Sequence, residues 1–246
     1  WKWGLLDWDK LINPLAAGVR CAHNVTTVSP SYMKELQHDA NGLETLMAAE
    51  SYKCRGVLNG IDFEVWNPDT DAYLTHHFNS ETFKEGKEAN KEKLCDEFGF
   101  DKNLPLFIFI GRLVEEKSAD MFPAFLEAAF SKFGDQFSFL ILGSGDKRIE
   151  EILSSFNYKY NETLSHEMYA GADFLFMPSR VEPCGLNQMY AMRYGTVPVV
   201  RRIGGLQDTV MDFEDENGFG ICFQQVSIVD MLSGMDRGIQ LFKDSE

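Results

Sequence analysis

From Leu104 to the end of the chain, short apolar runs alternate with longer segments of mixed polarity. The apolar runs lie at residues 105–113, 137–145, 173–179, 196–202 and 218–223. Strands that are apolar throughout and are separated by helices are typical of a parallel sheet that is covered on both faces. The alternation therefore predicts an α/β fold built on a doubly wound parallel sheet.

The segments between these runs carry apolar residues at the spacing of amphipathic helices. The predicted helices span residues 119–133, 149–156, 161–170, 186–194 and 228–242. Before them lies the polar segment 72–101, in which KEGKEANKEKLCDEFGF, residues 84–100, predicts an exposed helix whose Leu94, Phe98 and Phe100 face inward. Closer to the N-terminus, the β-branched run at 24–30 predicts a strand, and residues 31–37 predict the start of a helix.

A change of composition predicts a domain boundary in the first third of the chain. The segment from Gly56 to Asp71, GVLNGIDFEVWNPDTD, is rich in Gly, Asn, Asp and Pro around isolated apolar residues, as interdomain linkers are. We therefore expect residues 1–55 to end one domain, 56–71 to form a linker and 72–246 to form a second domain. The chain begins without Met, at Trp1 in an apolar segment, so we interpret it as part of a larger protein.

Charge and cysteine content exclude several classes of function. The chain has 23 Lys and Arg against 38 Asp and Glu, a net charge of -15, which would repel nucleic acids and anionic membranes. No apolar run approaches the roughly 18 residues of a membrane helix. The five cysteines are dispersed and form no CxxC pair, which favours neither disulfides nor a zinc site. The sequence also contains no HExxH motif, so the histidines do not indicate a metal site. We expect a soluble protein of a reducing, intracellular compartment.

Doubly wound sheets bind ligands beyond the carboxyl ends of their strands. The residues expected there are Gly111-Arg112, Gly143–Gly145, Ser179–Glu182 and Arg201–Gly205. Cations collected at this edge of an acidic chain suggest an anionic ligand, and a phosphate would also find free N–H groups at a helix start.

Each of these residues also has a purely structural explanation. Arg112 and Lys117 could pair with acids at the start of the next helix, as surface cations commonly do. The acids within reach are Glu115, Glu116 and Asp120. The glycines of residues 143–145 lack the full GxGxxG spacing, so they could serve a tight turn alone.

Five motifs resemble the glycogen and starch synthase family of retaining glucosyltransferases, over nearly all of the chain. They are GRLVEEK, YNETLSHEMYAGADFLFMPS, RVEPCGLNQMYAMRYGTVPVVRRIGGLQDTV, VTTVSPSY and GVLNGIDFEVWNPDTD. The resemblance implies a two-domain glycosyltransferase B fold, with the sheet as its Rossmann-like C-terminal domain and residues 1–55 as a remnant of the N-terminal domain. It also implies transfer of glucose from a nucleotide sugar to the non-reducing end of an α-1,4-glucan, with the anomeric configuration retained.

The same resemblance implies roles for individual residues. Arg112 and Lys117 would hold the diphosphate and Glu182 would contact the donor glucose, which makes these three the expected catalytic residues. Tyr160 would stack on the nucleotide base. The expected substrate-binding residues are Asn59, Gly111, Tyr160, Cys184, Gly185, Leu186 and Asn187. We expect no metal or other cofactor, because two cations can stabilise the departing phosphate, and we favour ADP-glucose over UDP-glucose as donor.

Departures from the family limit what this chain is expected to do alone. The family's KxGGL loop is absent from all 246 residues, so we expect the fragment to be inactive without the N-terminal domain of the same protein. Ser118 stands where Gly is common, and Asn187 where Thr is common. Two alternatives remain: another retaining nucleotide-sugar transferase, of the sucrose-phosphate or trehalose-phosphate type, or a non-catalytic glucan-binding module. We expect a bacterial cytoplasmic protein, or a plastid protein if it is a starch synthase.

Overall fold

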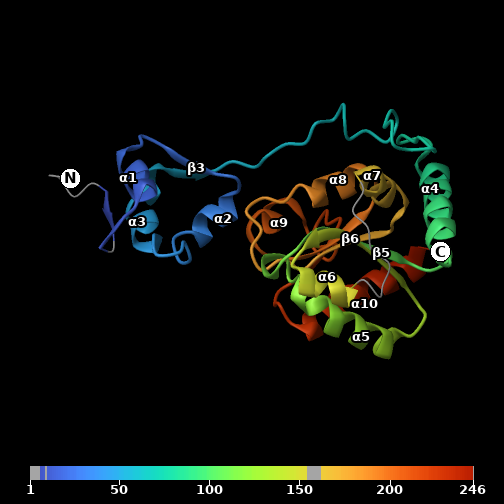
Figure 1. The fold of residues 1–246 in the computed structure, drawn as a ribbon. Coiled ribbons are helices and arrows are strands. Elements are labelled where there is room, and N and C mark those ends of the chain that lie inside the picture. Colours follow the sequence, from blue (N-terminus) through green and yellow to red (C-terminus); the bar gives the residue numbers. More distant parts are fainter. Residues whose placement is uncertain (1–5, 9, 154–161, 246) are drawn as a thin grey trace.

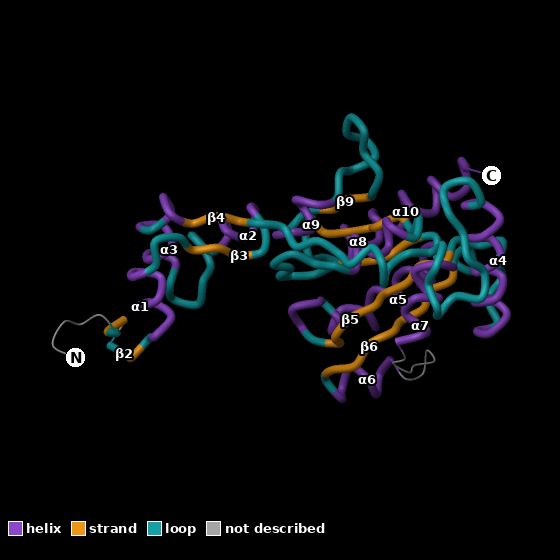
Figure 2. The backbone as a smooth tube through the Cα atoms, turned by 90° about the horizontal axis from the view of Figure 1, so that it is seen from above, coloured by secondary structure: helices purple, strands orange, loops and turns teal. Residues whose placement is uncertain are grey.

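The computed structural model describes residues 6–8, 10–153 and 162–245, which form two unequal parts joined by an extended segment (Figure 1). The small unit at the N-terminus packs its helix α2 (Pro30–Glu35) near α9 (Gly204–Thr209) of the larger sheet domain. The connecting segment runs across the sheet domain to α4 (Phe83–Phe98), on the far side from the small unit (Figures 1 and 2).

The sheet domain is built on five parallel strands in the order β6-β5-β7-β8-β9. The strands are β5 (Leu106–Leu113), β6 (Ser138–Gly145), β7 (Phe174–Met177), β8 (Val197–Arg201) and β9 (Ile221–Phe223). The chain adds β6 on one side of β5 and all later strands on the other side, so the strand order reverses between β5 and β7. The predicted doubly wound α/β sheet is confirmed.

Alternate residues of each strand face opposite sides of the sheet and enter two separate apolar clusters. On β5, Phe107 and Phe109 join one cluster and Leu106 and Ile108 join the other. The first cluster packs against α5 (Phe122–Phe133), α6 (Lys147–Leu153) and α10 (Ile228–Ser245). The second packs against α4, α7 (Glu162–Gly171), α8 (Asn187–Arg193) and α9. Both faces are therefore covered by helices, as the apolar strands require.

The predicted helices are found with small shifts at their ends. The helix expected at 119–133 begins as a 3-10 turn at Ala119–Met121 before α5 starts. In α4, Leu94 is only 2% exposed, and Phe98 and Phe100 pack against the same cluster, as predicted. Helix α9 was not predicted, because its first residues, Gly204 and Gly205, suggest a loop. Among the described helices, none combines the length and the apolar character needed to cross a lipid bilayer.

The small unit has one apolar cluster of its own. Its elements are β1 (Asp7–Trp8), β2 (Leu11–Ile12), α1 (Pro14–Cys21), β3 (Val25–Thr27), α2, α3 (Glu44–Ala49), a 3-10 turn at Ser51–Lys53 and β4 (Cys54–Gly56). Strands β3 and β4 pair in parallel, and the cluster lies between them and the helices. The side chain of Ser29 accepts the N–H of Tyr32 at 3.1 Å and so caps α2, which begins with Pro30.

The connecting segment, residues 57–82, contains neither helix nor strand, and its two halves differ in burial. Val57 and Val65 in the first half are more than half exposed. Farther along, Trp66 packs partly buried against the sheet domain, and Asp71 is 3% exposed. The linker predicted at 56–71 stays a prediction, but its last residues are anchored to the sheet domain.

Candidate active site

The loops that follow β5 and β7 enclose a cavity of about 180 Å³. It is lined by Phe109, Ile110, Gly111, Lys117, Met177, Ser179, Glu182, Gly185, Leu186 and Asn187. The cavity lies where the strand order reverses, the point at which doubly wound sheets bind their ligands. Six of the ten residues predicted for the site therefore line one cavity, although they come from two segments far apart in the sequence.

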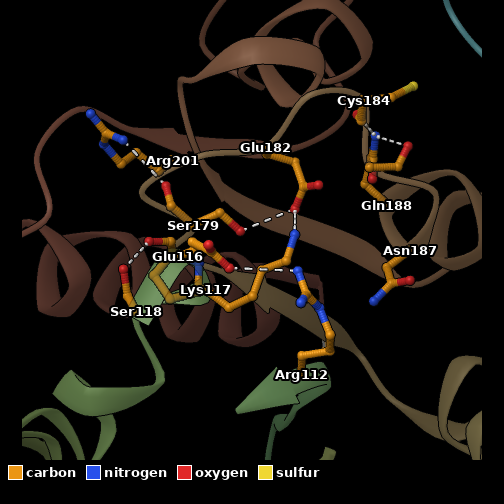
Figure 3. A network of polar contacts seen from close by, with 12 residues as sticks. Arg112, Glu116, Lys117, Ser118, Ser179, Glu182, Cys184, Asn187, Gln188 and Arg201 are labelled. Atoms are coloured by element: carbon orange, nitrogen blue, oxygen red, sulfur yellow. Dashed lines mark hydrogen bonds and ion pairs between the residues drawn. The ribbon is translucent and has the colours of Figure 1, made fainter. Parts of the chain in front are cut away.

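An ion pair between Lys117 and Glu182 forms the charged part of this cavity (Figure 3). The ammonium of Lys117 and the hydroxyl of Ser179 (3.1 Å) both donate to the same carboxylate oxygen, Oε2 of Glu182. Glu182 is only 5% exposed, and a buried carboxylate of this kind requires such partners. The other oxygen, Oε1, accepts no hydrogen bond from the described residues and points away from Lys117 (Figure 3). That oxygen is available to a ligand.

A tight turn after β5 places Lys117. The chain leaves β5 through a 3-10 turn at Glu115–Lys117 and then adopts left-handed backbone angles at Ser118, with φ of 57°. Left-handed angles cost a non-glycine residue roughly 1–2 kcal/mol. The Ser118 hydroxyl donates to the carbonyl of Pro178 at 2.7 Å. The turn after β5 is thereby tied directly to the loop after β7.

Arg112 lies at the rim rather than inside the cavity. Its side chain is 70% exposed, it extends from the end of β5, and its Nη2 lies 3.6 Å from the carboxylate of Glu116 (Figure 3). For Arg112, the structural alternative of pairing with a neighbouring acid is therefore observed. Lys117 does not follow that alternative, because its carboxylate partner is Glu182 from the next loop.

The loop after Glu182 presents backbone N–H groups to the cavity. Gly185 has a φ of +73°, and a Cβ there would lie 2.5 Å from the side chain of Gln188. Helix α8 begins at Asn187, whose side-chain amide donates to the carbonyl of Ile110 at 2.5 Å. Within the described part of the chain, the N–H groups of Gly185, Leu186 and Asn187 have no acceptor. They can therefore donate to oxygens of a phosphate or a sugar.

Two residues outside the predicted catalytic and substrate-binding set support this loop from behind. Arg201 donates from Nη1 to the carbonyls of Ser179 (3.2 Å) and Arg180 (3.0 Å). The side-chain amide of Gln188, which is fully buried, donates to the carbonyls of Cys184 and Gly185, at 3.0 Å each. Arg201 was predicted as a cation of the ligand edge, but its guanidinium is used by the protein backbone. No motif distinguishes such a role from ligand binding.

Three other described features of the prediction, Asn59, Cys184 and residues 143–145, do not line the cavity. Asn59 is exposed in the connecting segment, and Tyr160 lies outside the described residues. Cys184 is 4% exposed and contributes its backbone to the loop without lining the cavity. At residues 143–145, a Cβ on Gly143 would lie 1.9 Å from the carbonyl oxygen of Gly111, so this glycine is needed for the close approach of β5 and β6. The structural explanation of that motif is thus observed.

The charges around the cavity come from side chains of the protein. No group of three or more His, Cys, Asp or Glu within residues 6–8, 10–153 and 162–245 is arranged to hold a metal ion. Lys117, Arg112 and the free N–H groups are positive or partly positive, and the Glu182 carboxylate is negative. The positive groups can bind an anion. Beside it, the carboxylate can accept the hydroxyls of a sugar and stabilise a developing positive charge on its ring.

Residues 90–234 match the family described as glycosyl transferases group 1, and residues 1–49 match the starch synthase catalytic domain. The chain is 51% identical to the glycogen synthase of Flavobacterium johnsoniae over 98% of this chain and 53% of that protein. It is 40% identical to the glycogen synthase of Treponema denticola over 94% of this chain and 49% of that protein. The chain therefore spans about half the length of these curated relatives.

A solved structure shares both fold and sequence with the chain. It is the catalytic domain of starch synthase IV from Arabidopsis thaliana bound to ADP and acarbose, with a TM-score of 0.84 and 33% identity. The alignment covers 94% of this chain and 51% of that one. The resemblance to glycogen and starch synthases seen in the sequence motifs is confirmed.

Proposed function

The chain belongs to the glycosyl transferases of group 1, and from this premise we propose that it supplies the donor-binding half of a glycogen or starch synthase. The complete enzyme would transfer glucose from a nucleotide sugar to the non-reducing end of an α-1,4-glucan and retain the anomeric configuration. The other half of the site would come from an N-terminal domain of the same protein, which this chain would need for activity.

The observation that carries this proposal is the Lys117–Glu182 pair beside three free N–H groups at the β5–β7 reversal. Cleavage of the bond between glucose and the diphosphate leaves negative charge on the phosphate and positive charge on the sugar. Lys117 has three N–H donors, so it can hold Glu182 and a phosphate oxygen together. A positioned donor of this kind contributes about 3 kcal/mol to the transition state, on the order of 10² in rate.

Glu182 and Arg112 would complete the donor site. The free Oε1 of Glu182 would accept hydroxyls of the glucose and stabilise positive charge at its anomeric carbon. Arg112, at the rim, would close on the outer face of the diphosphate and exchange its exposed pair with Glu116 for a phosphate. We propose that these two cations do the work of a metal ion, and that the reaction needs no further cofactor.

ADP-glucose is the donor that we favour. The starch synthase IV structure contains ADP, which supports an adenosine-linked sugar for this chain as well. Tyr160 stays a prediction for the base, and Asn59 and Cys184 stay predictions for substrate binding. We also propose a bacterial cytoplasmic enzyme, which the bacterial relatives and the free cysteines support.

Calorimetric titration of this chain with ADP-glucose, ADP and UDP tests the donor site. We expect Arg112→Ala to weaken ADP binding about 10-fold, because a charge-assisted hydrogen bond is worth about 1.5 kcal/mol or more. Lys117→Gln should weaken it further, since the glutamine can still donate to Glu182 but carries no charge. Tighter binding of ADP than of UDP would support the favoured donor.

Lys132→Ala is the matched control. Lys132 is also a half-exposed cation with an acidic partner, Asp236 at 2.9 Å, but it lies on α5, away from the cavity. Its replacement should leave the affinity unchanged. Equal affinities for wild type, Arg112→Ala and Lys117→Gln would overturn the assigned phosphate roles.

A further inference from the structure

The small unit contacts the sheet domain through two short helices, α2 and α9, that are far apart in the sequence (Figures 1 and 2). The carboxylate of Asp208, on α9, accepts two hydrogen bonds from Ser31. The Ser31 N–H donates to Oδ2 at 2.7 Å and the hydroxyl donates to Oδ1 at 2.6 Å. Ser31 is 8% exposed, so this contact is largely removed from water and holds the first turn of α2 against α9.

A second carboxylate connects the other end of α2 to α9, and in this contact the accepting side chain lies on α2. Oε1 of Glu35 accepts the backbone N–H of Gly204 at 2.7 Å, across 169 positions of the sequence. Gly204 is the first residue of α9 and has a φ of +45°. Burial lowers the pKa of Arg201 below its usual value, and the nearby carboxylate of Glu35 counteracts this shift, so its charge acts on the side chain that holds the carbonyls of Ser179 and Arg180.

The next peptide group connects this contact to the candidate active site. The N–H of Gly205 donates to the carbonyl of Glu182 at 2.9 Å. Both glycines pack directly on that loop: a Cβ on Gly204 would lie 2.1 Å from the Glu182 carbonyl oxygen, and one on Gly205 would lie 2.1 Å from that of Cys184. With so little space, movement of the Gly204–Gly205 backbone must move the backbone that carries the Glu182 carboxylate.

We propose that Glu35 is a positioning residue, which couples the docking of the small unit on α9 to the backbone of Glu182. Its carboxylate fixes the Gly204 N–H, and the adjoining Gly205 N–H then fixes the Glu182 carbonyl. A charge-assisted bond from a carboxylate to a backbone N–H is strong enough to set this geometry. The consequence for donor binding rests on the function proposed above, whereas the coupling itself depends only on the contacts.

Amide hydrogen exchange, resolved by NMR, tests the coupling in this chain without any ligand. We expect Glu35→Ala to speed exchange of the Gly204 N–H and also of the Gly205 N–H, each at least 5-fold. Glu35 does not contact the second of these groups. Glu35→Gln should restore most of the protection, because its amide oxygen can still accept the Gly204 N–H.

Glu44→Ala is the matched control in the same unit. Glu44 also accepts backbone N–H groups, from Ala40 at 2.8 Å and Gly42 at 2.9 Å, but both are local to the small unit. It should leave exchange at Gly204 and Gly205 unchanged. Exchange of the Val57 N–H, which donates to Thr27 at 2.9 Å, reports whether the small unit remains folded in each variant.

Titration with ADP gives the second readout. Glu35→Ala should weaken ADP binding about 3- to 10-fold, with partial recovery in Glu35→Gln. Faster exchange at Gly204 with unchanged exchange at Gly205 would overturn the coupling. Faster exchange at both groups with unchanged ADP affinity would overturn its consequence for donor binding. If wild type fails to bind ADP, the proposed donor function is wrong, and the exchange rates alone decide the coupling.

Discussion

The sheet domain and the small unit contain the same kinds of elements but differ in how completely they bury them. In the sheet domain, both faces of a five-stranded sheet are covered, and Phe107, Phe125 and Leu142 are completely buried. In the small unit, Leu11 and Leu15 are 72% and 64% exposed, around one small cluster. Isolated two-stranded sheets are marginal in water. The small unit buries less apolar surface of its own, so we expect the α2–α9 contact to contribute to its order.

The connecting segment repeats this difference on a smaller scale. Its second half is held by a buried network in which Oδ2 of Asp71 accepts hydrogen bonds from His166 Nδ1 (2.7 Å) and from the hydroxyl of Tyr194. Trp66 stacks on the rings of His166 and Tyr190, with centroids 4.0 and 3.7 Å apart. Among the residues that the structure describes, no comparable buried contacts hold Val57 or Val65. Any bending between the two parts should therefore occur before Trp66.

The largest effect should come from the sheet-domain core. Phe125 is fully buried and stacks on Phe176 with ring centroids 5.0 Å apart. We expect Phe125→Ala to lower the free energy of unfolding of the sheet domain by about 3–5 kcal/mol, measured by urea denaturation. Leu46→Ala, in the small unit, should speed hydrogen exchange there and leave the sheet-domain transition in place. An equal loss of that transition in both variants would mean that the two parts unfold as one.

The anchor of the connecting segment should have the next largest effect. Burial acts to raise the pKa of Asp71, but hydrogen bonds from His166, Tyr194 and the Tyr73 N–H outweigh it and hold the pKa below its usual value. A carboxyl whose folded pKa is lowered stabilises the protein above its unfolded pKa of about 3.9, and this contribution is lost as the pH falls through the folded pKa.

Asp71→Asn should therefore cost about 2 kcal/mol of unfolding free energy at pH 7, and this cost should shrink as the pH falls below about 3.9 towards the lowered folded pKa. Urea denaturation from pH 7 to pH 3 measures both. Asp69→Asn is the control, since Asp69 is exposed and its carboxylate lies 3.5 Å from the amide of Asn79. Parallel stability curves for wild type and Asp71→Asn across this range would show that the network does not depend on the charge.

The sequence was sufficient for the sheet and insufficient for the contacts between elements. Apolar runs such as 105–113 predict strands because a parallel strand that is buried on both faces is apolar at nearly every position. Helix α9 escaped prediction because Gly204 and Gly205 weaken any local helix signal. Glycine is needed at both positions because the backbone of Glu182 and Cys184 packs against them. This requirement comes from the tertiary structure, so the local sequence does not reveal it.

The candidate site was predictable to the same degree. Lys117 and Glu182 could be placed at one edge because parallel strands end together, and the structure joins them. Their pairing with each other, and the exposure of Arg112, could not be predicted, since ion pairing depends on side-chain geometry across two loops. Arg201 shows the opposite failure. Its position at the ligand edge predicted ligand binding, but its guanidinium donates hydrogen bonds to the backbone carbonyls of Ser179 and Arg180.

The smallest effect should come from the exposed half of the connecting segment. Val57 is 60% exposed, and its only hydrogen bond within the described part of the chain is the one from its N–H to the carbonyl of Thr27. Val57→Ser keeps that bond and removes little buried apolar surface, so urea denaturation should show a change within about 0.5 kcal/mol. A loss comparable to that of Asp71→Asn would mean that this half also packs against the protein in solution. The segment would then be anchored along its whole length, and bending before Trp66 would be excluded.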